Sequence, residues 1–334
     1  MSGRDWTADG PADVARAPTA PGALLPDLAG FAHSALLYDG SDQDLGWATA
    51  IVRRAAESGA PLHIAVPGRT MRLVSEALRP SSRQAFLADM TDLGRNPARI
   101  IPAAQSFGDE HPGEHVYCVW EPAWPARSSA ELVEVTRHEA LCNLAFRGRE
   151  MTIICLYDTS RLPACVIKDA QRTHPVVVSS GYQRPSTSYL GPGRLPPGCD
   201  DPLPPPAKDA AFVAFRGHLG PVREFSASQA RAAGLVSSRA SDLVLAVSEL
   251  AANAIGHAAG GGVVRSWCTD EEILCQIEDY GHIADLLAGR RRQPADAPGG
   301  HGLWLVNRVC DLVERRTGPA GTITRLHMRL RAAA

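Results

Sequence analysis

A proline-rich segment in the middle of the chain limits how its 334 residues can fold. From Arg184 to Lys208 the sequence reads RPSTSYLGPGRLPPGCDDPLPPPAK, with almost no apolar periodicity. Proline fixes φ and removes a backbone donor, so this segment cannot be the interior of a helix or strand. We interpret residues 183–208 as an interdomain linker. The chain then divides into two bodies, residues 30–182 and 209–334, preceded by residues 1–29, whose Ala/Pro/Gly-rich composition predicts disorder.

Composition argues against several classes of protein. The chain has 34 basic and 36 acidic residues, a formal net charge of -2, which argues against a dedicated nucleic-acid binder. No run of about 18 apolar residues occurs, so no membrane-spanning helix is expected. The eight cysteines form no Cys-x-x-Cys pair. We therefore interpret them as reduced thiols of a cytosolic protein rather than as a disulfide or zinc framework.

In the first body, short apolar runs alternate with helical patterns. Strands are expected at residues 33–38, 61–66, 115–120 and 151–157, and helices at residues 44–58, 70–78 and 129–146. Continuous apolar strands separated by helices predict a mostly parallel sheet covered on both faces.

In the second body, helices and strands come in blocks. Helices are expected at residues 221–233, 238–258 and 302–312, and strands at 212–217, in a hairpin over 262–281, and at 322–330. This order predicts an α/β sandwich with its helices on one face of an antiparallel sheet.

Polar residues at three places in the second body suit a nucleotide. Glu249 and Asn253 are four residues apart and therefore share one helical face. An amide oxygen can bind Mg²⁺, and a nearby carboxylate can accept a proton. Asp279 ends an apolar strand, where its carboxylate can accept a hydrogen bond from the exocyclic amine of adenine. Gly281, two residues later, lets a flat base approach the backbone.

A glycine-rich turn completes this set. Gly300 and Gly302 lead directly into an apolar helix, whose first N–H groups suit a phosphate. The turn has no Gly-Lys-Ser/Thr ending, so it is not a P-loop. Thr322 opens the final strand, where its hydroxyl can support the base-binding carboxylate.

In this order, the motifs resemble the Bergerat ATP-binding fold of gyrase, Hsp90, histidine kinases and MutL-type ATPases. The resemblance implies ATP and Mg²⁺ as cofactors, with Asn253 as the Mg²⁺ ligand, Glu249 as the catalytic carboxylate and Asp279 as the adenine anchor. It further implies that Gly281, Gly300 and Gly302 contact the base and the phosphates. Thr322 would support the contact of Asp279 with adenine. The loop His282–Gly299, with Arg290, Arg291 and Arg292, would then be the ATP lid.

Within that superfamily, SELAANAIGHA and GGHGLWLVNRVCD look like the anti-sigma regulatory kinases. Members of that family bind a sigma factor and can phosphorylate a serine on a STAS-type anti-sigma antagonist, and they often form homodimers through the ATP-binding half. The resemblance implies a cytoplasmic protein serine/threonine kinase that acts in partner switching. From the charge balance and the lack of a long apolar run, we expect no direct contact with nucleic acid or membrane.

The first body is similar to the MEDS sensory domain (methanogen/methylotroph, DcmR-type). The matching text is HSALLYDGSDQ (His33–Gln43), ADMTDLGRNPARIIP (Ala88–Pro102), WEPAWPARSSAELVEVTRHEALCN (Trp120–Asn143) and CLYD (Cys155–Asp158). The resemblance implies a degenerate RecA-like domain, without a P-loop, that senses a small-molecule ligand. No ATP hydrolysis is therefore expected in this half.

Several alternatives remain open. Arg137-His138-Glu139 superficially resembles the phosphoacceptor box of a sensor histidine kinase. The second body could instead bind ATP without catalysis, as a module that sequesters a sigma factor or its antagonist. Polar residues of the first body form either a ligand pocket or a structural network, and His138, Glu139 and His174 among them form a candidate metal set. These residues are Arg95, Asn96, Glu121, Arg127, Glu131, His138, Glu139, Asn143, Tyr157, Asp158 and His174.

Overall fold

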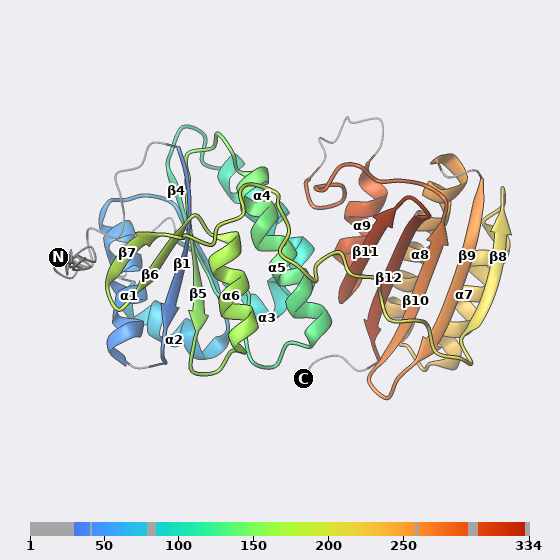
Figure 1. The fold of residues 1–334 in the computed structure, drawn as a ribbon. Helices are drawn as coiled ribbons and strands as arrows, with labels where there is room; N and C mark the ends of the chain where they lie inside the picture. The colour runs from blue at the N-terminus through green and yellow to red at the C-terminus, as the bar shows by residue number, and fades with distance from the viewer. Residues whose placement is uncertain (1–29, 41, 79–84, 258–259, 293–299, 331–334) are drawn as a thin grey trace, which may run out of the picture.

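The structure is a computed structural model that describes residues 30–40, 42–78, 85–257, 260–292 and 300–330. The disorder predicted for residues 1–29 lies outside the described residues, as does the second half of the predicted lid, 293–299. Two α/β domains lie side by side (Figure 1).

The first domain is built on a sheet of order β3-β2-β4-β5-β1-β6-β7. Neighbouring strands are parallel throughout, except that β7 runs antiparallel to β6. The strands are β1 (Phe31–Tyr38), β2 (Leu62–Val66), β3 (Ala85–Asp89), β4 (Val116–Trp120), β5 (Met151–Asp158), β6 (Val176–Ser179) and β7 (Tyr182–Pro185). The helices are α1 (Asp42–Glu57), α2 (Gly68–Ala77), α3 (Met90–Leu93), the 3-10 turn η2 (Pro97–Arg99), α4 (Ile100–Asp109), α5 (Ser129–Ala145) and α6 (Ala164–Thr173).

Alternate residues of β1 belong to two different apolar cores, because successive side chains of a strand point to opposite faces of the sheet. Ala35 and Leu37 pack with residues of α4, α5 and α6, whereas Leu36 and Tyr38 pack with residues of α1 and α2. The predicted, mostly parallel sheet with both faces covered is confirmed.

The second domain has a sheet of order β11-β12-β10-β9-β8, antiparallel throughout. Its strands are β8 (Ala211–Arg216), β9 (Gly261–Cys268), β10 (Glu272–Asp279), β11 (Leu312–Gly318) and β12 (Gly321–Arg329). Its helices are α7 (Gly220–Ala232), α8 (Ser237–His257) and α9 (His301–Val309). Ile273, Cys275 and Ile277 of β10 belong to one core with buried residues of α8, such as Val247 and Leu250. The predicted sandwich with helices on one sheet face is confirmed.

The structure differs from expectation at the end of α9. A helix was predicted to residue 312, but α9 ends at Val309, and a strand not predicted from the sequence, β11, begins at Leu312. Asp311 separates the two: its carboxylate accepts hydrogen bonds from Arg239 (2.5 Å) and from the backbone N–H of Arg329 (2.7 Å). These bonds fix the chain beside β12, so that Leu312 and Val313 continue as a strand rather than as a helical turn.

Residues 183–185 of the predicted linker belong instead to the edge strand β7. From residue 186 to 210 the segment has no helix or strand and crosses the outer face of the second sheet (Figure 1). Arg316 of β11 donates to the carbonyl of Asp201 (2.9 Å), and Arg325 of β12 donates to that of Pro204 (2.5 Å). The linker is therefore tied to the domain that follows it. Among the described helices, none is long and apolar enough to cross a bilayer.

Candidate functional site

The long helix α8 presents its two polar candidates to the start of α9. Glu249 and Asn253 are both half-buried. A Cβ added to Gly302 would lie 2.7 Å from Glu249 Oε2 and 3.7 Å from Asn253 Nδ2, so any larger residue here would displace the Glu249 carboxylate. Gly300, the N-cap of α9, has φ 85°, a left-handed conformation that glycine adopts without strain. The structure thus brings Glu249, Asn253 and Gly302 together at a helix N-terminus.

The second group lies where β10 ends beside the start of β12. Asp279 shares the helix-facing side of β10 with Ile277, and it pairs in register with Thr322. One carboxylate oxygen of Asp279 accepts the N–H of Gly281 (2.7 Å), and Thr322 Oγ1 donates to the carbonyl of Gly281 (2.8 Å). Burial raises the pKa of Asp279, and the Gly281 N–H opposes that rise. These bonds fix the Asp-Tyr-Gly turn and use one of the two carboxylate oxygens of Asp279.

A large cavity lies on the other side of this turn. It measures about 830 Å³ and is lined by linker residues Pro202 and Leu203 and by outward-facing residues such as Val263 and Ile323. Asp279 and Thr322 also line it, but Glu249, Asn253 and Gly302 do not. Since nucleotide recognition of the predicted kind needs α8, we assign the candidate site to the helix side of the sheet and not to this cavity.

The described half of the predicted lid is docked on the first domain. Leu287 is 1% exposed and belongs to the apolar core of that domain. The buried Arg290 forms a close ion pair with Glu134 of α5, which is also buried. The Gly289 carbonyl accepts a hydrogen bond from Asn307 Nδ2 of α9 (3.0 Å). Arg290 is therefore held by the first domain; the exposed Arg291 contacts Asp285 instead (3.6 Å). Sequence reasoning missed Glu134 and Leu287 because their partners lie in the other domain.

Most polar residues expected in the first domain form structural contacts. Arg95 pairs with Asp311 (2.9 Å), and Asn96 Nδ2 donates to the carbonyl of Asn307 (3.0 Å), so both join the two domains. Others tie loops to helices or strands within the first domain: Glu121 accepts from Tyr38 and Thr70, Arg127 donates to the carbonyls of Pro122 and Gly94, Glu131 forms the capping box of α5 with Ser128, and Asp158 accepts from Ser160. For these residues the structural network is the better interpretation.

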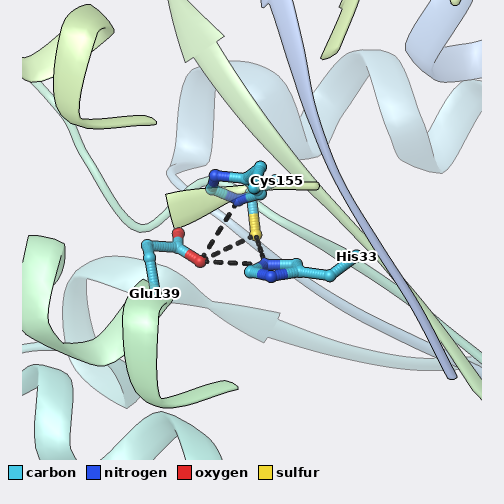
Figure 2. A group of neighbouring side chains, drawn as sticks. His33, Glu139 and Cys155 are labelled. Atoms are coloured by element: carbon cyan, nitrogen blue, oxygen red, sulfur yellow. Dashed lines mark hydrogen bonds and ion pairs between the residues drawn. The ribbon is translucent and has the colours of Figure 1, made fainter. Parts of the chain in front are cut away.

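A second group of polar residues gathers in the interior of the first domain (Figure 2). Glu139 of α5 lies beside His33 of β1, Cys155 of β5 and His174, the residue that follows α6. The sequence suggested His138, Glu139 and His174 as one candidate metal set. The structure separates its members, because His138 and His174 fall in different groups that share Glu139. His33 and Cys155 were not predicted; only the strand pairing that places both on one sheet face could have identified them.

His138 itself is 0% exposed, inside α5. A phosphoacceptor histidine must reach the γ-phosphate of a nucleotide bound elsewhere, so this buried ring does not support the histidine kinase alternative.

Comparisons with known families agree with the two folds. Residues 32–175 match the family model of MEDS, the methanogen/methylotroph, DcmR sensory domain. Residues 212–328 match that of the histidine kinase-like ATPase domain. No curated protein matches the chain. The chain thus joins an N-terminal MEDS sensory domain to a C-terminal histidine kinase-like ATPase domain of the GHKL type.

Proposed function

We propose that this protein is an ATP- and Mg²⁺-dependent serine/threonine kinase that acts in sigma-factor partner switching, with its MEDS domain as the controlling sensor. The observation that carries the proposal is the grouping of Glu249, Asn253 and Gly302 at the N-terminus of α9. The two family matches support the broader conclusion that the chain is a regulatory ATP-binding protein of the kinase-like class. The sigma factor and the STAS-type antagonist are proposed partners, which implies a cytoplasmic activity.

The residues present fit the proposed cofactors. The space that a Cβ on Gly302 would fill, next to a carboxylate and an amide, provides room for phosphate oxygens near a neutral Mg²⁺ ligand. Asn253 would bind the cation, and Asp279, braced by Thr322 through Gly281, would accept from the adenine amine. Gly300 and Gly302 would present backbone N–H groups to the phosphates.

When bound, Mg²⁺·ATP supplies the transferable phosphoryl group. Glu249 is the described carboxylate beside Asn253 and Gly302, so it is our candidate base for the proton of the attacking serine hydroxyl. The rest of the proposed catalysis is positioning and charge neutralisation, as is general for phosphoryl transfer.

Transfer of the radiolabelled γ-phosphate of ATP to a cognate STAS protein tests the proposal. We expect a label that resists acid and leaves in alkali, the behaviour of phosphoserine; the reverse stability would indicate phosphohistidine. Glu249→Gln should abolish transfer while retaining ATP and partner binding. Glu271→Gln, an exposed carboxylate at the β9–β10 turn, is the matched control and should transfer normally.

The non-catalytic module is the second candidate. It is supported by the lid contacts, because a lid segment that Arg290 and Leu287 anchor to the first domain is suited to shape a binding surface. If the wild-type chain binds ATP and a partner but transfers no phosphate to any cognate STAS protein, this second function replaces the first.

A further inference from the structure

We infer that the MEDS domain contains a buried, four-coordinate site for a divalent cation of the Zn²⁺ class, formed by His33, Glu139, Cys155 and His174. Nothing in the proposed kinase function requires this site. All four side chains are buried, at 2%, 1%, 0% and 0% exposure. They come from β1, α5, β5 and the residue after α6, so that elements far apart in the sequence converge on one point (Figure 2).

Three of the four donor–donor distances fall in the range of a tetrahedral zinc site, and the fourth, between His33 and Glu139, is shorter. The Nε2 atom of His33 lies 3.1 Å from Glu139 Oε2 and 3.6 Å from Cys155 Sγ. Oε2 also lies 3.4 Å from Cys155 Sγ and 3.4 Å from His174 Nε2. A tetrahedron with Zn–S of about 2.3 Å and Zn–N or Zn–O of about 2.0–2.1 Å has edges of roughly 3.3–3.6 Å.

Hydrogen bonds behind the two rings determine which nitrogen carries the proton. His174 Nδ1 lies 2.7 Å from the carbonyl oxygen of Ala170, which only accepts, so Nδ1 must donate. The amide of Asn143 donates to the carbonyl of Thr173 (2.7 Å), so its Oδ1, 3.2 Å from His33 Nδ1, is the acceptor there. A neutral imidazole that donates through Nδ1 carries its lone pair on Nε2, and the Nδ1 atoms of both rings face such acceptors. Metal-bound histidines are commonly oriented by this kind of bond to the other nitrogen.

Both lone pairs point toward the same carboxylate oxygen. His174 Nε2 is buried and makes no hydrogen bond with the described residues. Glu139 Oε1 accepts from Tyr157 (2.9 Å), which leaves Oε2 facing two ring nitrogens and a thiol. Electron pairs that converge in a buried space repel one another unless a cation lies among them. Imidazole, carboxylate and thiolate together suit Zn²⁺ better than Mg²⁺ or Ca²⁺.

The site is tested on the full chain by elemental analysis after purification without chelator. We expect about one zinc ion per chain, as in four-ligand structural sites. Cys155→Ser and His174→Gln should each lose most of it. Cys118→Ser is the matched control, because Cys118 is a buried thiol on the neighbouring strand β4 outside the donor group, and it should retain the metal.

Cobalt substitution provides a readout that does not depend on these variants folding. Wild-type protein stripped with chelator and titrated with Co²⁺ should develop a thiolate-to-cobalt charge-transfer absorption together with the visible bands of tetrahedral Co²⁺. A chain that purifies without zinc and shows neither band would overturn the inference and leave a proton as the only cation in the group. Equal zinc content in wild type and both ligand variants would overturn it as well.

Discussion

At the scale of single residues, His327 shows how a buried ring depends on its neighbours. It lies on the outer face of the second sheet, with Nδ1 3.0 Å from Glu272 and Nε2 3.0 Å from Glu314. Burial lowers its pKa, but the hydrogen bonds to the two carboxylates outweigh that effect and raise the pKa to about 9. The folded state therefore binds this proton more tightly than the unfolded chain, whose value is 6.5.

The contribution of the His327 proton to stability should consequently disappear in alkali. It is fully present below about pH 6.5 and is lost as the pH rises through about 9. At about 1.4 kcal/mol per pKa unit, the loss is on the order of 3 kcal/mol. Urea unfolding of wild type and His327→Gln over this range measures it: the stability difference should shrink as the pH rises. A difference that is constant with pH would contradict the raised pKa.

Gly302 gives a prediction about the nucleotide site. Gly302→Ala places a methyl group 2.7 Å from Glu249 Oε2, so that either the carboxylate or α9 must move. We expect ATP binding to weaken by about tenfold or more, equivalent to about 1.4 kcal/mol, as measured by calorimetry with Mg²⁺ present. Gly256→Ala in α8 is the control, since its added Cβ meets nothing within 4 Å. Unchanged affinity in Gly302→Ala would place the phosphates elsewhere.

At the scale of elements, α5 joins the two domains. Its Glu134 is 0% exposed and pairs with Arg290 of the lid segment and with Arg316 of β11 (3.2 Å). Removing one partner of a buried ion pair leaves the other charge without compensation, at a cost of about 3–5 kcal/mol. These ion pairs therefore anchor α5 to the second domain through Arg290 and Arg316.

Glu134→Gln should therefore loosen the segment proposed as the lid. We expect faster amide hydrogen exchange over residues 285–292 and a loss of stability of about 3 kcal/mol, since the amide cannot neutralise Arg290. Glu76→Gln, an exposed carboxylate on α2, should change neither quantity. Unaltered exchange in Glu134→Gln would show that the ion pair does not hold this segment.

The same helix shows where sequence reasoning reached its limit. Residues 129–146 were correctly predicted as helix, and α5 spans Ser129–Ala145. The sequence alone could not decide whether its polar residues form a ligand pocket or a structural network, because most of their partners come from distant segments or from the second domain. The boundaries of α8 and β10 were predicted closely, since strong apolar periodicity decides them locally. The short edge strand β3 and the amphipathic α6 lack such a continuous apolar signal, and both were missed.

The candidate functional residues also differ in how far they could be predicted from the sequence. Asp279, Gly281 and Thr322 could be recognised because their order along the chain indicates the fold, and the strand register then explains their meeting. The donor group around Glu139 has no regular spacing: its members are 106, 16 and 35 residues away from that carboxylate, counting from His33, Cys155 and His174. Only the β1–β5 pairing and the packing of α5 assemble it.

At the scale of the whole molecule, α5 contributes to the proposed cation site and also contacts the proposed lid of the nucleotide site. Glu139 would bind the cation, and Glu134, little more than one turn earlier on the helix, pairs with the lid arginine Arg290. A shift of α5 on loss of the cation would therefore reach the lid through a buried ion pair. Any coupling of this kind is reciprocal: ATP must change the affinity for zinc by the same factor that zinc changes the affinity for ATP.

We expect that factor to be about fivefold or more, the usual lower range for coupled sites. It is measured on the full chain by competition for zinc against a coloured chelator with and without ATP, and by ATP titration of zinc-loaded and stripped protein. ATP itself binds zinc, so Asp279→Asn, which should no longer bind the nucleotide, corrects for that effect. In Glu134→Gln the factor should approach one, because the connection to Arg290 is weakened while both sites keep their ligands. Equal affinities in the wild-type chain would mean that the sensory domain acts on the ATPase domain by a route other than α5.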